Sequence, residues 1–318
     1  MMNIERMQVT KGLVFNRKIT FLKKQWFKNK YVYIMLLPVL AYFIVFCYVP
    51  MYGAIIAFKD FSPSKGIMGS TWVGFKHFTN FFHSYYFVRL LKNTLLINVY
   101  DVLFGFPSPI ILALMLNEVR SKVYKRTVQT LSYLPHFISV VVAAGIILDF
   151  TSRTGVINKI LLMFGIASIP FMIMPEWFRT IYVGSGIWQN LGWDSIIYLA
   201  ALSSINPQLY EASKIDGAGR WKQLLYVTLP SIAPTITILL ILRFGSMLSA
   251  DFQKIILIYN PTIYDTSDVI SSYVYRQGIL MNDYSYSTAV GLFNSLINFI
   301  LLVTVNRISK MTNEVSLW

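Results

Sequence analysis

The sequence predicts an all-α integral membrane protein with six transmembrane helices, and three observations carry this prediction. Of the 318 residues, 55% are hydrophobic and only 13% are charged, and the mean hydropathy is +0.55. A soluble domain carries about 25% charged residues, so this chain has about half the charge that a water-facing surface needs. Long apolar runs recur six times, and basic residues are concentrated in alternate connecting segments. This composition argues against both a soluble enzyme and a disordered chain.

Each apolar run is long enough, or nearly so, for the roughly 20 residues that a bilayer-spanning helix needs. In chain order the runs are 31–58, 94–116, 133–150, 181–202, 232–250 and 289–305. Aromatic residues cluster near several ends, as expected at headgroup depth. The first run follows a long basic tail, and no small-residue cleavage pattern comes after it. We therefore expect a retained first helix rather than a signal peptide.

Lys and Arg residues define the expected orientation. The N-terminal tail, the segments after the second and fourth runs and the C-terminal tail hold 17 of them, whereas the intervening segments hold 8. Because cytoplasmic segments are enriched in Lys and Arg, both termini are expected in the cytoplasm, in a multi-pass protein of the cytoplasmic (inner) membrane. The net charge of +14 is then mostly a topology signal. A nucleic-acid partner would need a basic patch on a soluble module, and the sequence contains none.

The expected organisation is a basic cytoplasmic tail over 1–30, a six-helix transmembrane domain over 31–309 and a cytoplasmic tail over 310–318. The first tail mixes aromatic residues with lysines. Such a segment either lies on the inner membrane surface or only sets the topology; both readings stay open.

Signatures of catalysis and nucleotide binding are absent from the sequence. It has no G-x-x-x-x-G-K-[ST], H-E-x-x-H or G-x-S-x-G motif, and a single cysteine, Cys47. His77 and His83 are expected to be exposed or interfacial in an outer loop, and His136 to cap or position the third helix. The chain is therefore expected to be no enzyme, with no catalytic residue, no metal and no cofactor of its own.

The segment 204–230, between the fourth and fifth runs, carries the strongest local pattern. Asn206 is suited to cap a short helix, and the proline that follows suits its first position. Gly217 lets the backbone turn, and a second helix over 220–227 is expected to end before Pro230. The segment therefore predicts a helix–turn–helix with small and charged residues available to another protein. A loop packed only on its own membrane domain would look similar.

This segment resembles the EAA loop of binding-protein-dependent ABC importer permeases, whose pattern is E-A-A-x-x-D-G-A followed by an apolar–Pro pair. The matching residues are Glu211, Ala212, Asp216, Gly217, Ala218 and Pro230. Ser213 stands where the second alanine is usual, and its small size should preserve docking. The segments 61–67, 72–75, 133–139, 186–193 and 199–202 are similar to the carbohydrate-type permeases, in the subgroup of lipoprotein-linked polysaccharide importers.

The resemblance implies the ABC type I importer permease fold and one permease subunit, which forms half of a translocation pathway for oligosaccharides or polysaccharide fragments. It implies as partners a second permease, which the family suggests is distinct, two ATPase subunits that bind ATP and Mg, and an extracytoplasmic solute-binding protein. The loop would dock on an ATPase as a coupling helix. The residues assigned to coupling are Glu211, Ala212, Ser213, Asp216, Gly217, Ala218 and Arg220.

Polar residues at membrane depth are costly and usually face a cavity, which selects candidates for the solute path. They are Asp101, Gln189, Asn190, Asp194, Arg243 and Asp251, together with Trp188 and Trp193, whose rings suit stacking on sugars. The structural alternative is that Asp101 and Arg243 pair with other spans and that the tryptophans pack at interfaces. The acidic residues of the last outer loop either form a solvated face or meet the solute-binding protein; they are Asp265, Asp268 and Asp283.

Two other functions stay open at this point. A secondary carrier would move solute without an ATPase, and the EAA-like loop counts against it because such a carrier needs no docking lever. A membrane-embedded glycan-handling enzyme would require converging acidic or histidine residues at membrane depth, which the sequence does not show in a recognisable pattern.

Overall fold

The computed structural model describes residues 28–313, 316 and 317, so most of the expected N-terminal tail lies outside the described residues. The described chain is overwhelmingly helical. Its two short strands, β1 (Lys59–Asp60) and β2 (Thr71–Trp72), pair antiparallel with Lys59 opposite Trp72. The chain divides into two compact units, residues 1–55 and 56–318.

The first unit contains the first apolar run. Its α2 (Lys30–Tyr42) continues through a π-helical stretch over Phe43–Tyr48 into α3 (Val49–Met51). The π turns lie directly before Pro50, where a wider turn accommodates the missing proline N–H. No side chain of α2 or α3 is buried within the structure, which leaves an apolar helix surface suited to lipid or to another protein.

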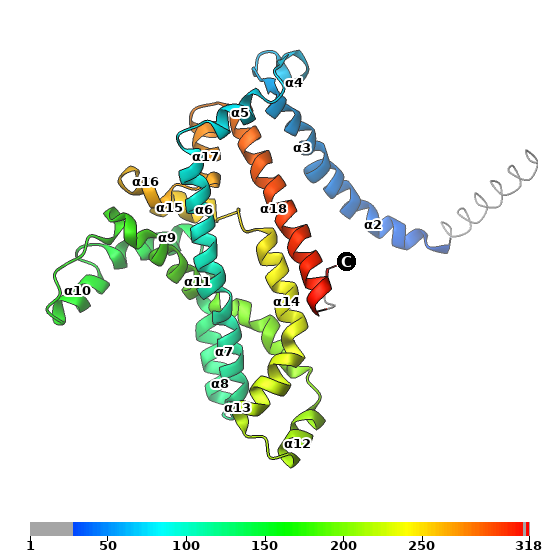
Figure 1. Cartoon of the computed structure of the whole chain (residues 1–318), viewed down its shortest axis with the longest axis vertical. Helices are drawn as coiled ribbons and strands as arrows, with labels where there is room; N and C mark the ends of the chain where they lie inside the picture. Colours follow the sequence, from blue (N-terminus) through cyan, green and yellow to red (C-terminus); the bar gives the residue numbers. More distant parts are fainter. Residues whose placement is uncertain (1–27, 314–315, 318) are drawn as a thin grey trace, which may run out of the picture. The chain divides into compact units, whose positions relative to one another are not determined.

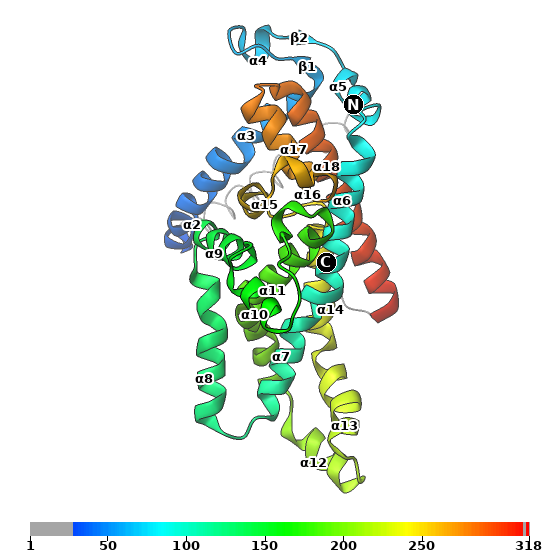
Figure 2. The ribbon, with the colours of Figure 1, turned by 90° about the vertical axis from the view of Figure 1, so that its left-hand side faces the viewer.

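The second unit contains the remaining helices (Figures 1 and 2). In chain order they are α4 (Gly66–Gly69), α5 (Lys76–Phe82), α6 (Phe87–Tyr100), α7 (Pro107–Glu118), α8 (Lys122–Tyr133), α9 (Val140–Thr151), α10 (Val156–Met163), α11 (Pro175–Ser203), α12 (Pro207–Ile215), α13 (Arg220–Gln223), α14 (Leu229–Gly245), α15 (Phe252–Ile258), α16 (Tyr264–Ser267), α17 (Ile270–Tyr275) and α18 (Tyr284–Asn313).

Five helices of the described chain are long and apolar enough to cross a membrane: Lys30–Phe58, Phe87–Glu118, Val140–Met163, Arg220–Gly245 and Tyr284–Met311. The fourth expected span lies within α11, which is 29 residues long and contains Glu176, Arg179 and Asp194. At about 1.5 Å per residue such a helix is longer than the roughly 30 Å hydrocarbon core. Because of its polar residues, α11 is not among the five helices that are apolar enough to cross a membrane, so the count of six spans stays a prediction.

The third span differs from the prediction of one helix over 133–150. Helix α8 ends at Tyr133, a 3-10 turn covers Leu134–Phe137, and α9 begins only at Val140. Pro135 lacks the N–H that a continuing helix needs. Ser139 then starts the next helix, because its Oγ accepts a hydrogen bond from the backbone N–H of Val142.

The helix predicted over 220–227 was expected to end before Pro230, and this prediction is wrong. Helix α13 continues through π-helical turns over Leu224–Thr228 directly into α14. As before Pro50, the π turns precede the proline. The wider turn lets the helix continue although the proline has no backbone N–H to donate. The fifth span consequently begins within the loop motif, and α14 ends at Gly245 instead of 250.

Helix α11 lies at the centre of the second unit and contacts α7, α8, α14 and α16. A buried cluster of Ala113, Tyr198, Leu202 and Ile232 joins α7, α11 and α14. Figures 1 and 2 both place α12 and α13 at one end of this unit and α4 and α5 at the opposite end. The two loops therefore lie at opposite ends of this unit, and their assignment to opposite membrane sides stays a prediction.

Candidate coupling loop and solute path

The loop between α11 and α14 forms the predicted helix–turn–helix. Asn206 Oδ1 accepts a hydrogen bond from the backbone N–H of Gln208 at 3.0 Å, and Pro207 occupies the first turn of α12. The cap satisfies an N–H that would otherwise lack a partner, and proline at this position loses no helical hydrogen bond. The short helix is therefore defined by its own sequence.

Gly217 makes the turn that ends α12. Its φ is +75°, in the left-handed region that favours glycine. Its N–H donates to the carbonyl of Lys214 at 3.0 Å, and the N–H of Ala218 donates to that of Ser213 at 2.9 Å. This pair of bonds is a Schellman cap, which sets a sharp angle between the two helices.

The outer surface of the loop is open. Neither α12 nor α13 has a buried residue, and Ile215 and Trp221 are 86% and 77% exposed. Within the described residues, the side chains of Glu211, Asp216 and Arg220 have no ion-pair partner. Exposed apolar side chains beside unpaired charges are the composition of a surface that meets another protein.

One contact at the base of the loop was missed by the sequence reasoning. The hydroxyl of Tyr210 lies 3.0 Å from Oγ1 of buried Thr228, at the start of the fifth span. Ser213, the departure from the family pattern, is half-buried and donates to the carbonyl of Tyr210 at 2.9 Å. No pattern in the sequence pairs residues 210 and 228. The contact ties α12 to the start of the fifth span.

Several predicted solute-path residues line one polar cavity of about 210 Å³ in the second unit. Asp101, Gln189, Asn190, Arg243 and Asp251 all face it. Arg243 forms an ion pair with Asp101, which joins the second span to the fifth. That pairing is the structural alternative raised from the sequence, and it occurs at the edge of a cavity. A neighbouring cavity of about 250 Å³ shares the ion pair and is also lined by the predicted Asp194.

The cavity also contains a lysine that the sequence reasoning did not select. Lys254 is only 5% exposed, and its Nζ donates to the carbonyl of Tyr182 at 2.9 Å. Burial lowers the pKa of Lys254 to about 8, against the attraction of Asp251 and Asp101. Asp251 caps α15, accepting backbone N–H bonds from Gln253 and Lys254 at 3.1 and 3.4 Å. No spacing or motif marks a lysine just beyond a predicted span.

The interruption of the third span packs against α11. Nδ1 of His136 lies 3.0 Å from Oδ1 of Asn190, and its ring stacks on Trp193 with centroids 4.5 Å apart. Nε2 of Gln189 donates to the carbonyl of Ile138 at 3.2 Å. Backbone groups freed by a break at membrane depth need such partners. Three predicted solute-path residues therefore also hold the broken span in place, and His136 positions it.

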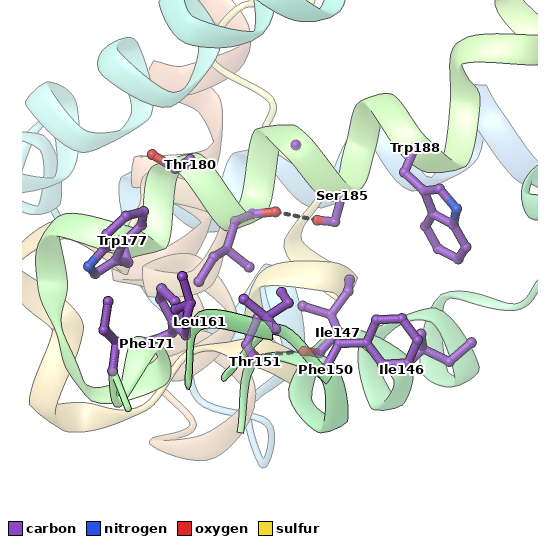
Figure 3. Close-up of a pocket in the computed structure, with 14 residues that line it drawn as sticks. Ile146, Ile147, Phe150, Thr151, Leu161, Phe171, Trp177, Thr180, Ser185 and Trp188 are labelled. Carbon is purple, nitrogen blue, oxygen red and sulfur yellow. Dashed lines mark hydrogen bonds between the residues drawn. The ribbon is translucent and has the colours of Figure 1, made fainter. Parts of the chain in front are cut away.

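Trp188 lies elsewhere. It lines a largely apolar pocket of about 760 Å³ formed by α9, α10 and α11, together with Ile147 and Phe150 (Figure 3). At the other end of this pocket Trp177 packs edge-on against Phe171, with centroids 5.1 Å apart. The two predicted tryptophans thus have different surroundings: Trp193 stacks on His136, and neither ring lines the polar cavity.

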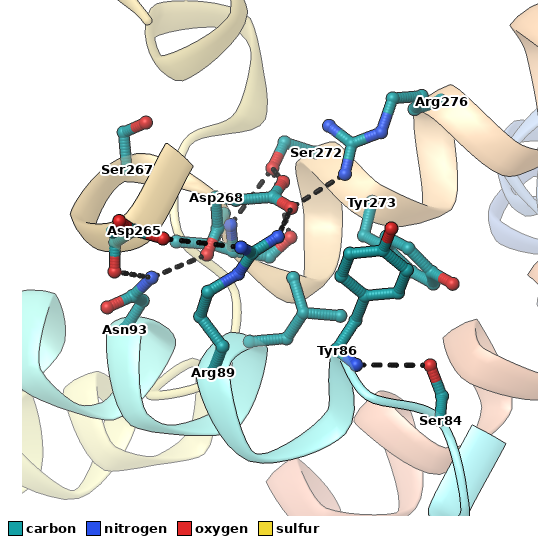
Figure 4. A network of polar contacts seen from close by, with 12 residues as sticks. Ser84, Tyr86, Arg89, Asn93, Asp265, Ser267, Asp268, Ser272, Tyr273 and Arg276 are labelled. Atoms are coloured by element: carbon teal, nitrogen blue, oxygen red, sulfur yellow. Dashed lines mark hydrogen bonds and ion pairs between the residues drawn. The ribbon is translucent and has the colours of Figure 1, made fainter. Parts of the chain in front are cut away.

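The loops before α18 hold a buried charge network (Figure 4). Asp268 is fully buried, with Arg276 Nη2 at 2.6 Å and Arg89 Nη2 at 3.6 Å. Burial opposes the charge of Arg276, but the bond to Asp268 outweighs it and raises the pKa of the guanidinium. The expectation of a solvated acidic face was wrong for Asp268, because Arg89 from α6 reaches it. Asp265 is exposed as expected.

His77 also departs from expectation. It is 7% exposed, and its Nε2 lies 3.1 Å from Oδ1 of Asp60 and 3.2 Å from the carbonyl of Lys59. The ring therefore secures the β1 strand. Among the described residues, no group of His, Cys, Asp and Glu side chains is arranged to hold a metal ion.

Comparison with known proteins places this geometry in a family. The model of the binding-protein-dependent transport system inner membrane component matches residues 105–312. The chain is 46% identical to protein LplB of Bacillus subtilis over 92% of each chain. It is 45% identical, over 90% of each, to the polygalacturonan/rhamnogalacturonan transport system permease protein YteP of the same organism.

Solved structures agree. A bacterial alginate ABC transporter, in complex with a periplasmic protein carrying an alginate pentasaccharide, contains a chain that is 45% identical to this one. The TM-score is 0.86, with 92% of this chain and 99% of that chain covered. A bacterial ABC transporter involved in the import of the acidic polysaccharide alginate gives 46% identity and the same TM-score. The chain is thus a multi-pass membrane protein with the type I importer permease fold, and it belongs to the family of binding-protein-dependent transport system inner membrane components, the permeases of ABC importers.

Proposed function

We propose that this chain is one permease subunit of an ATP-driven importer of oligosaccharides or polysaccharide fragments in the cytoplasmic membrane. The similarity to the alginate transporter chain, over almost the whole length of both, carries the proposal. The named transport of polygalacturonan and rhamnogalacturonan by a relative supports the same substrate class. The chain forms half of the pathway, within a six-helix domain over 31–309. A second, distinct permease forms the other half, and an extracytoplasmic binding protein delivers the solute.

The loop of α12 and α13 is the proposed contact with one of two ATPase subunits, which bind ATP and Mg. Glu211 supplies a charged contact, Ala212 the position of close approach and Gly217 the turn. The open surface of the loop, its unpaired charges and its rigid caps support this role. Because α13 continues without interruption into α14, a displacement of the loop reaches the fifth span directly.

The proposed solute path runs past the polar cavity at Asp101, Asn190 and Arg243. Support comes from the interrupted third span, because irregular backbone at membrane depth is tolerated where it lines a cavity or is buried in protein. The hydrogen bonds of Gln189 and Asn190 fix the wall of this cavity. Asp194 extends the polar lining toward the α12 end of α11.

The test is reconstitution of the chain with its partner permease, ATPases and binding protein in liposomes. We expect uptake of an oligosaccharide that requires ATP, is blocked by vanadate and needs the binding protein. A chain that purifies alone and moves solute down an ion gradient would identify a secondary carrier instead. Chemical conversion of the glycan by the purified chain would identify a membrane-embedded enzyme.

A further inference from the structure

The polar cavity contains one buried cation, the ammonium group of Lys254. Among the described residues it donates only one of its possible hydrogen bonds. An ammonium group has three N–H donors. Lys254 uses one on the carbonyl of Tyr182, and its Nζ lies 4.8 Å from the centre of the Tyr182 ring. No carboxylate of the described chain forms an ion pair with it. A buried ammonium without a paired anion is costly, so such a group usually has a functional reason.

The acidic groups of the cavity attract the ammonium without forming an ion pair with it, and each of them has another partner. Asp101 is paired with Arg243, and Asp251 accepts the first N–H groups of α15. Space next to the ammonium is available, because the backbone at Gly186 carries no side chain there; an added Cβ would lie 3.5 Å from Nζ. The cavity has room for roughly seven water molecules at about 30 Å³ each, which suits a small polar group of a larger solute.

We propose that Lys254 binds a carboxylate of an acidic sugar in this cavity, and that it makes the permease selective for uronate-containing oligosaccharides. Arg243 also lines the cavity, but its guanidinium is paired with Asp101, so Lys254 is the cation left for the carboxylate. The inference rests on the proposed importer function and narrows its substrate class.

The chemistry of the named relatives agrees with this selectivity. Polygalacturonan is a chain of galacturonate units, each with a carboxylate, and alginate is named as an acidic polysaccharide. A neutral sugar could satisfy an ammonium with hydroxyl groups, but a carboxylate also compensates its charge. Charge-assisted hydrogen bonds are about twice as strong as neutral ones.

The test measures equilibrium binding of trigalacturonate and of its methyl ester to the complete transporter in nanodiscs, without the binding protein. The ester has nearly the same size and no charge. We expect the wild type to bind the acid about tenfold more tightly than the ester, the contribution typical of a hydrogen bond to a charged group. Lys254→Met should make the two affinities equal, whereas Lys254→Arg should keep the preference for the acid.

Lys159 is exposed on α10, and Lys159→Met is the matched control that should change neither affinity. If Lys254 only supported the fold, Lys254→Met would weaken both ligands alike and leave their ratio unchanged. Retention of the acid preference by Lys254→Met, or its absence in the wild type, would overturn the inference. Failure of the proposed function is a separate result: the wild-type complex would then import no oligosaccharide even with its binding protein.

Discussion

Gly217 is the position where a single substitution should separate ATP hydrolysis from transport. Its φ of +75° is closed to proline, whose ring holds φ near −65°. Gly217→Pro also removes the N–H that bonds the carbonyl of Lys214 at 3.0 Å. Gly217→Ala is milder: the added Cβ has no atom within 4 Å, so its cost is the left-handed conformation itself, about 1–2 kcal/mol.

A penalty of about 1.4 kcal/mol lowers the equilibrium constant between the native turn and its alternatives about tenfold. We therefore expect Gly217→Ala to reduce transported solute per ATP by at most about tenfold in proteoliposomes, and Gly217→Pro to abolish transport. Membrane insertion and ATP hydrolysis should persist in both. Asparagine tolerates the left-handed region, so Gly217→Asn should restore much of the activity.

The neighbouring Gly219 is the matched control. Its φ is −70°, and an added Cβ would meet nothing within 4 Å. Gly219→Ala should accordingly transport like the wild type. Full, ATP-coupled transport by Gly217→Pro would refute the assignment of α12 as a coupling helix.

Three further changes probe the packing. Gly192→Ala should lower the stability of the purified complex by about 1–3 kcal/mol, because its Cβ would meet the backbone carbonyl of Ser132; an unchanged thermal unfolding curve would contradict this close contact. Asp268→Asn should destabilise the complex by about 3–5 kcal/mol in the same assay, since it leaves Arg276 without an ion pair and Arg89 with only the exposed Asp265, and a neutral effect would refute the network. Asp101→Asn and Arg243→Gln should be non-additive in uptake, with a coupling of at least about 0.5 kcal/mol; additive losses would show that the pair does not interact.

Local signals were the parts of this protein that sequence reasoning predicted well. The hydropathy runs correspond to described helices for most of the expected spans, because burial in lipid imposes its pattern residue by residue. The helix–turn–helix was predicted from Asn206 and Gly217, whose roles depend only on the adjacent backbone. The family pattern then supplied a function that these local signals alone do not contain.

The failures concern contacts between distant segments. The pairing of buried Asp268 with Arg89 joins residues far apart in the sequence, and nothing near either side chain indicates it. The place of Lys254 in the polar cavity depends on the path of α11 in the same way. The prediction that the helix ends before Pro230 failed for a different reason. A π turn has no reliable residue signature, so the proline was interpreted as a helix end.

The proposed function requires that the α12 loop of this permease engages an ATPase during transport. The most direct measurement is disulfide cross-linking of Ala212→Cys, an exposed position on α12, to cysteines placed along the partner ATPase surface. The wild-type background contains only Cys47, which is removed first. We expect a cross-link that forms at one surface site and blocks solute uptake until it is reduced. Uptake that continues undiminished with the loop cross-linked, or a chain that transports with no ATPase present, would contradict it.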